Sequence, residues 1–144
     1  MKKRILSIVL SIVMLVSLLP TTAFAASYEV QWTSAVTADG APDYVAENYR
    51  GTLQEAFVAA NAAESTVYVT LLTNITASDG VFTLAAGKSM VLESSNTITI
   101  NCSSNESVGI STEAGSSLMV VGGTISLSAG TGITKAYGIK AGGE

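Results

Sequence analysis

The 144-residue chain has no histidine and only one cysteine. Without an imidazole there is no Ser–His or Cys–His pair, so the common mechanisms of nucleophilic hydrolysis are excluded. One cysteine cannot form an internal disulfide, so the fold must be held together in another way. Cys102 falls at a small, inward-facing strand position, and we interpret it as a buried apolar side chain because a metal-ligand or reactive role has no partner Cys or His in the sequence.

The chain also lacks the short motifs of common active sites. There is no Gly-x-Ser-x-Gly sequence and no Asp-x-Asp-x-Asp calcium loop, and residues 128–132 (SAGTG) lack the lysine and spacing of a phosphate-binding loop. Glu93, Glu106 and Glu113 are the acids of the repeat described below, and none is in register with another acid, as a catalytic carboxylate pair would need. We therefore predict no catalytic residue, no cofactor and no metal site in this chain.

Basic residues are few, with 7 Lys and Arg against 11 Asp and Glu. Three of them, Lys2, Lys3 and Arg4, begin an export signal, so its removal changes the formal net charge from −4 to −7. Nucleic acids and anionic lipid surfaces need a basic patch on their partner. The acidic balance excludes both as partners and is typical of the solvated surface of an exported protein.

Residues 1–25 form a predicted signal peptide. The basic start is followed by an apolar run from Ile5 to Leu19, then by Pro20 and the small-residue pattern Ala23-Phe24-Ala25. A membrane anchor is the competing interpretation, but the run is shorter than the roughly 20 residues that a spanning helix needs. We expect cleavage near Ala25 and a secreted or cell-surface protein that leaves the membrane after cleavage.

The mature chain divides into three predicted parts: a strand and loop over residues 26–50, a capping helix over 51–65, and repeated strands over 66–144. Thr52-Leu53-Gln54-Glu55 has the form of a capping box. Residues Leu53, Ala56, Phe57 and Ala60 follow at helical spacing and predict one apolar face. Alternation over residues 66–72 predicts a strand, and residues 74–80 are interpreted as a turn-rich link.

Residues 80–144 contain an internal repeat. Residues 84–92 (LAAGKSMVL) align with 112–120 (TEAGSSLMV) at an offset of 28, and 97–100 (TITI) align with 124–127 (TISL) at an offset of 27. A third copy begins at Tyr137, and the chain ends within it, so we expect further turns to follow. Three short strands in each copy predict a mainly β fold, a right-handed parallel β-helix with a short N-terminal capping helix. The incomplete last turn predicts end-to-end association.

Alternation assigns the two faces of these strands. The inward residues are predicted to be Phe82, Leu84, Met90, Leu92, Ile98, Ile100, Cys102, Ile110, Leu118, Val120, Ile125, Leu127, Ala129, Tyr137 and Ile139. An apolar stripe of Val91, Met119 and Val121 has outward parity. Either the segment around Trp32 covers this stripe, or a bulge breaks the parity.

The outward face of the third strand offers a candidate binding surface. It is a polar ladder of Thr97, Thr99, Asn101, Thr124, Ser126 and Ser128, whose short hydroxyl and amide groups could bind glycan hydroxyls. Two other interpretations stay open: threonine is a good residue for any exposed strand, and a longer array of this kind could order water as ice-binding solenoids do.

The segments LQEAF, TVYVTLLT, AGKSMVL and GGTISL resemble the opening of large secreted surface proteins of Gram-positive bacteria, in which a short helix precedes a pectin-lyase-like, right-handed β-helix. The resemblance covers residues 50–144. It implies an extracellular role in adhesion or glycan contact, with a glycan, host surface or cell wall as partner. The acidic and basic cluster of the lyases and hydrolases of this fold has no match here.

Three functions are consistent with the sequence. The first is a non-catalytic extracellular or cell-surface module for adhesion or glycan contact. The second is the N-terminal part of a secreted polysaccharide lyase or glycoside hydrolase whose catalytic turns lie beyond residue 144. The third is a structural stalk that holds other domains away from the cell wall.

Overall fold

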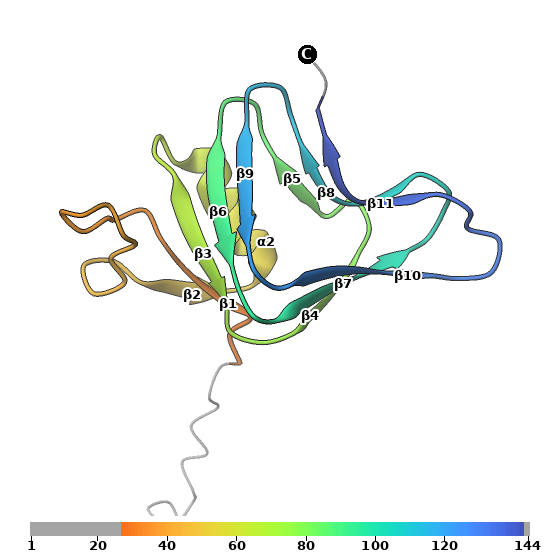
Figure 1. The fold of residues 1–144 in the computed structure, drawn as a ribbon, viewed down its shortest axis with the longest axis horizontal. Helices are drawn as coiled ribbons and strands as arrows, with labels where there is room; N and C mark the ends of the chain where they lie inside the picture. Colours follow the sequence, from red (N-terminus) through yellow and green to blue (C-terminus); the bar gives the residue numbers. More distant parts are fainter. Residues whose placement is uncertain (1–26, 143–144) are drawn as a thin grey trace, which may run out of the picture.

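The structure, a computed structural model, describes residues 27–142, and the predicted signal peptide lies outside this range. The described chain is mainly β with one short helix (Figure 1), as predicted. The helix is α2 (Leu53–Ala62). The strands are β1 (Val30–Thr33), β2 (Tyr49–Gly51), β3 (Val67–Leu71), β4 (Ile75–Ser78), β5 (Phe82–Leu84), β6 (Ser89–Glu93), β7 (Thr97–Cys102), β8 (Ser107–Thr112), β9 (Ser117–Val121), β10 (Thr124–Ala129) and β11 (Ala136–Ala141).

The strands form three small sheets. The first has the order β2-β1-β3-β6-β9 and is mixed, because β1 pairs antiparallel with both β2 and β3 whereas β6 is parallel to β3 and β9. The second (β10-β7-β4) and the third (β11-β8-β5) are all parallel. In Figure 1 the three sheets surround a common interior. From β3 onward, consecutive strands belong to the first, second and third sheet in repeating order.

The predicted right-handed parallel β-helix of the pectin-lyase-like kind is not what the structure shows. Its three sheets do not close into a solenoid, and the first sheet begins with the antiparallel strands β1 and β2. The resemblance to helix-capped β-helical surface proteins of Gram-positive bacteria is therefore wrong. The physical reason lies in residues 27–51, which extend one sheet sideways by antiparallel pairing instead of adding another parallel turn.

The repeat itself is present as strand pairing. Ser89 pairs with Ser117 at the predicted offset of 28, and Thr97 pairs with Thr124 at the predicted offset of 27. The third copy also pairs, since Ile139 lies opposite Ile110. Equivalent residues of successive copies therefore lie side by side in parallel sheets.

Two strands lie where the sequence predicted none. Residues 74–80 contain β4, which pairs in parallel with β7 and buries Ile75 beside Ile98. Residues 49–51 form β2, at the junction of the predicted N-terminal loop (26–50) and the predicted capping helix (51–65). Both strands are short and end near glycine, so their local sequence is that of a turn, and their pairing depends on partners that are distant in the chain.

Helix α2 begins as predicted. The Thr52 hydroxyl accepts from the Glu55 amide at 3.2 Å, and the Glu55 carboxylate accepts from the Thr52 amide at 2.8 Å, which completes the capping box. The buried helix residues are Leu53, Ala56, Phe57 and Ala60, the predicted apolar face. This face packs on the interior, where the Phe57 ring stacks on Phe82 with centroids 5.3 Å apart.

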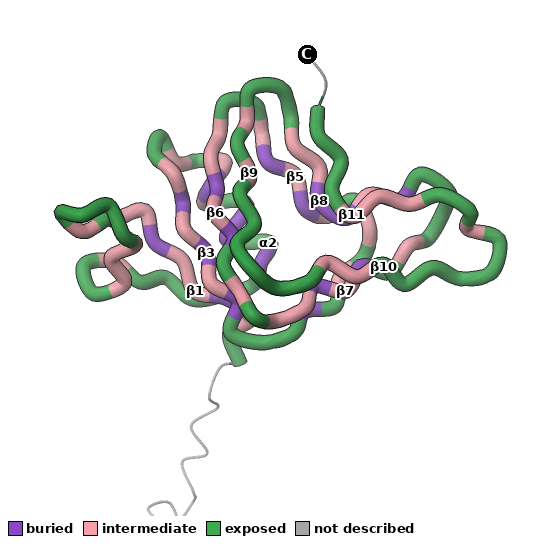
Figure 2. Tube along the Cα trace, viewed as in Figure 1, coloured by how far each residue is buried: buried purple, intermediate pink, exposed green. Residues whose placement is uncertain are grey.

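Burial follows the predicted alternation as far as β8 and weakens in β9, β10 and β11, the last strands of the chain. Leu84, Met90, Leu92, Ile98, Ile100 and Ile110 are at most 2% exposed. Their counterparts Val120, Leu127 and Ile139 are 38%, 37% and 45% exposed. Figure 2 shows this gradient, with the buried residues in β3, β6, β5 and β8 and exposed positions along β9 and β10. Cys102 is half-buried, with its thiol 3.8 Å from the Ile100 carbonyl, so it is less enclosed than predicted.

Asn61 joins the helix to β5. Its amide nitrogen donates to the Thr83 carbonyl and its amide oxygen accepts from the Ala85 amide, both at 2.9 Å. These bonds occupy the β5 edge that faces away from β8, as a paired strand would.

We expect Asn61→Ala to lower the free energy of unfolding by about 2 kcal/mol, because two partly buried backbone groups lose their partners. Urea unfolding followed by far-ultraviolet circular dichroism measures the change. Gln54→Ala, at an exposed position of the same helix, is the control and should leave the midpoint nearly unchanged. Equal midpoints for the two variants would show that the Asn61 bonds contribute no stability.

Candidate functional site

The six residues of the predicted polar ladder lie together on one sheet. Thr97 pairs with Thr124, Thr99 with Ser126, and Asn101 with Ser128. They alternate with the inward residues Ile98 and Ile100, so they share the outer face of β7 and β10.

Strand β4 adds a third row that the sequence analysis missed. Thr76 pairs with Thr99, and Ser78 pairs with Asn101, so both extend the ladder across the whole sheet. The signal was present in the alternation of Ile75 and Ala77 with these two residues. We call the complete set the hydroxyl face: Thr76, Ser78, Thr97, Thr99, Asn101, Thr124, Ser126 and Ser128.

The side chains of the hydroxyl face have no protein partner in the described part of the chain. None of the eight makes a side-chain hydrogen bond to another residue within 27–142, and all are exposed or half-buried. The neighbouring β5–β8 sheet differs, because there the outward hydroxyls of Thr83 and Ser111 bond to each other at 2.8 Å. Adjacent strands are about 4.8 Å apart, so the hydroxyl face presents unpaired polar groups at a regular short spacing.

The ends of the hydroxyl face are fixed by side chains that do have partners. Asn74 accepts from the Thr97 amide at 2.9 Å at one end. At the other end, Asp79 follows β4 and accepts from the hydroxyls of Ser103 and Ser107. The Ser107 hydroxyl, followed by that of Ser103, lowers the pKa of Asp79. The face itself carries no charged residue.

The three acids considered for catalysis have separate surroundings. Glu106 forms an ion pair with Lys135 at 2.7 Å. Lys135 lowers the pKa of Glu106, and Glu106 raises the pKa of Lys135. Glu113 accepts from the Ala86 amide at 3.0 Å, and Glu93 ends strand β6. Within residues 27–142, no group of three or more His, Cys, Asp or Glu side chains is placed to hold a metal ion.

The apolar stripe of Val91, Met119 and Val121 lies on the outer face of β6 and β9. Pairing of β6 with β9 is continuous, so no bulge breaks the parity. Trp32 does not cover the stripe, since Met119 and Val121 remain 58% and 45% exposed. Both explanations offered from the sequence are therefore wrong, and the stripe is an exposed surface of this chain.

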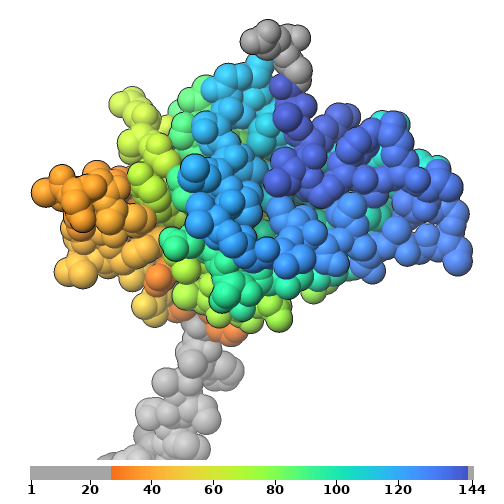
Figure 3. Space-filling view, in the orientation of Figure 1, coloured from red at the N-terminus to blue at the C-terminus, as the bar shows by residue number. Residues whose placement is uncertain are grey.

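Strands β9, β10 and β11 are each the outermost strand of their sheet. In Figure 3 the blue residues of these strands form much of the surface that faces the viewer. Their outer backbone edges and half-exposed inner side chains form one open end of the described fold. Association through this end stays a prediction.

Among the residues that the structure describes, no helix is long and apolar enough to cross a membrane. Comparison with known proteins adds no relative: no family model, no curated protein and no solved structure matches this chain.

Proposed function

We propose that this chain is an exported, non-catalytic module that contacts neutral glycans through the hydroxyl face. One observation carries the proposal: eight neighbouring hydroxyl and amide side chains, in register on three parallel strands, have no hydrogen-bond partner among residues 27–142. Hydroxyl and amide groups both donate and accept. Glycan hydroxyls do the same, so each can be satisfied by such a face.

The chemistry of the face favours a neutral glycan. It carries no Lys or Arg to attract sulfate, phosphate or uronate groups and no carboxylate to attract a cation. Its polar groups repeat at the strand spacing of about 4.8 Å. A polysaccharide also repeats its hydroxyls along its length, so one chain lying across the strands can meet several rows at once.

Export and surface location belong to the same proposal. They rest on the sequence of residues 1–25 and on the net charge of −7 that removal of this segment leaves. An extracellular module that contacts glycans would serve adhesion to a cell wall or to another cell.

A pair of double variants tests the hydroxyl face. We expect Thr99→Ala/Ser126→Ala to weaken binding to a neutral polysaccharide roughly tenfold, since each lost hydrogen bond is worth about 0.5–1.5 kcal/mol. A glycan array first identifies the ligand, and affinity electrophoresis in gels containing that polysaccharide then measures the dissociation constant.

Thr83→Ala/Ser111→Ala is the matched control, because it removes two outward hydroxyls from the neighbouring sheet where they bond to each other. It should retain the wild-type affinity. The proposal fails if the array finds no neutral glycan, or if both double variants bind as well as the wild type.

A further inference from the structure

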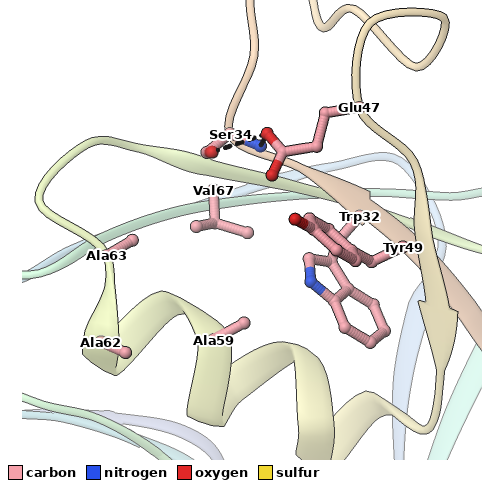
Figure 4. A pocket seen from close by; sticks show the side chains of 8 residues that line it. All are labelled: Trp32, Ser34, Glu47, Tyr49, Ala59, Ala62, Ala63 and Val67. Atoms are coloured by element: carbon pink, nitrogen blue, oxygen red, sulfur yellow. Dashed lines mark hydrogen bonds between the residues drawn. The ribbon is translucent and has the colours of Figure 1, made fainter.

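A cavity of about 440 Å³ lies between helix α2 and the first sheet, away from the hydroxyl face. Trp32 of β1 and Ser34, just after β1, border it, as do Glu47, just before β2, and Tyr49, the first residue of β2. Ala59 and Val67 belong to the opposite, apolar wall (Figure 4). None of these residues belongs to a site predicted from the sequence.

Two aromatic rings form one side of the cavity. Trp32 and Tyr49 lie opposite each other in the β1–β2 pair, and their rings stack with centroids 6.0 Å apart and planes 25° apart. Tyr49 is 53% exposed. Figure 4 shows the indole nitrogen of Trp32 on the cavity side, and this N–H makes no hydrogen bond within residues 27–142. The aromatic side therefore offers apolar surface and one unpaired donor.

A carboxylate borders the same space. Glu47 accepts from the Ser34 hydroxyl at 2.9 Å and from the Ser34 amide at 3.4 Å, which fixes its position over the cavity (Figure 4). The Tyr49 hydroxyl and then the Ser34 hydroxyl lower the pKa of Glu47, so it is ionised at neutral pH. In the described part of the chain Glu47 has no Lys or Arg partner, since the ion pair there joins Glu106 and Lys135.

These groups define the ligand by its chemistry. An ionised carboxylate only accepts and an indole N–H only donates, whereas the Tyr49 hydroxyl, which interacts with Glu47, keeps lone pairs that accept. A ligand that binds all three groups must be small and must carry both hydrogen-bond donors and acceptors. It also needs an apolar face that can pack on the two aromatic rings and on the alanine side chains of α2. An ammonium ion would meet the carboxylate but would leave the indole donor unmatched.

We infer that this cavity binds one neutral sugar ring, with its hydroxyls on Glu47, Tyr49 and the Trp32 indole and its C–H face on the apolar walls. A few placed polar groups in a largely apolar cavity of this size are typical of small-ligand sites. The inference rests on the proposed function for the class of ligand, but it uses a different set of residues. It gives the module a pocket for a single sugar unit in addition to the flat face for a polysaccharide chain.

Trp32 is the only tryptophan of the chain, so its fluorescence reports on the cavity directly. The mature chain is titrated separately with glucose, galactose, mannose and N-acetylglucosamine, and with tetramethylammonium chloride as the cation probe. We expect a saturable fluorescence change with at least one sugar, at a dissociation constant of about 1 mM, which is usual for so small a ligand.

Two variants assign the change to the cavity. Ala59→Leu fills the space from the helix side and should abolish sugar binding, and Glu47→Gln, which keeps the shape of the side chain, should weaken it about threefold to tenfold. Circular dichroism must show that both are folded, and calorimetry repeats the titration independently of Trp32. Thr83→Ala/Ser111→Ala, outside both the cavity and the hydroxyl face, should titrate like the wild type.

The outcomes separate this inference from the proposed function. No saturation with any sugar, saturation with tetramethylammonium alone, or wild-type sugar binding by folded Ala59→Leu would each overturn the sugar pocket. None of these results bears on polysaccharide binding by the hydroxyl face, which the Thr99→Ala/Ser126→Ala variant tests separately.

Discussion

Replacing Ile98 with aspartate is expected to abolish the cooperative unfolding transition of this chain. Ile98 is 2% exposed and lies in β7 between Ile75 of β4 and Ile125 of β10. A carboxyl group there would lose its water without gaining a partner, which costs several kcal/mol whether it stays ionised or takes up a proton. A domain of this size is stabilised by only about 5–15 kcal/mol in total.

Far-ultraviolet circular dichroism during heating and urea titration would measure the effect. Thr99→Asp is the matched control, because it places the same side chain at the next position of the strand, on the outer face. We expect the control to unfold cooperatively, close to the wild-type midpoint. A cooperative transition of Ile98→Asp at that same midpoint would show that Ile98 does not face the interior.

The second large effect concerns the contact between the helix and the sheets. Phe57→Ala should lower the free energy of unfolding by about 3–5 kcal/mol, because it removes a large buried side chain and leaves a cavity. Phe57 is 2% exposed and stacks on Phe82, so its loss also separates α2 from the start of β5.

Urea unfolding with a common slope for wild type and variant gives this difference directly. Val58→Ala is the control, since Val58 belongs to the same helix and is 64% exposed. Its midpoint should move little. If Phe57→Ala shifts the midpoint no more than Val58→Ala does, the helix is not docked through this face.

The parts of the fold that the sequence predicted well are those whose cause is local or repeated. The capping box of Thr52 and Glu55 and the apolar spacing of α2 lie within one short segment, so they can be recognised without knowing the partner. The pairing of β6 with β9 and of β7 with β10 follows from similar segments that recur in successive copies of the repeat.

The parts that were missed depend on distant partners. Strand β4 is short and has a turn-like composition, and only the presence of β7 beside it makes Ile75 a core residue. The antiparallel strands β1 and β2 break the parallel arrangement that the repeat predicted, because no repeat signal extends to residues 30–51. Closure into a solenoid was inferred from the repeat and from the resemblance to β-helical surface proteins. The repeat determines which strands pair, but it does not determine whether the sheets close.

The two candidate sites differ in the same way. Most of the hydroxyl face could be found from the sequence, because alternation and repeat register together place Thr97, Thr99 and Asn101 beside their counterparts. The cavity could not, because the pairing of Trp32 with Tyr49 brings together two side chains from opposite ends of an irregular loop. In the sequence, Trp32 and the segment Tyr49-Arg50-Gly51 are 17 positions apart, and no local pattern indicates that they meet at a cavity.

The strand pairing has a consequence for how the chain tolerates changes in length. The number of residues between two paired positions varies along the chain. It is smaller between Ile75 and Ile98 than between Ile110 and Ile139. The loops between consecutive strands, called corners here, differ in length to accommodate this difference. Within the strands, paired residues keep the same inward or outward orientation. An inserted residue at a corner therefore lengthens only a surface loop, whereas one inside a strand exchanges the two faces of everything that follows in that strand. The corners are thus the positions at which this chain accepts added peptides or tags.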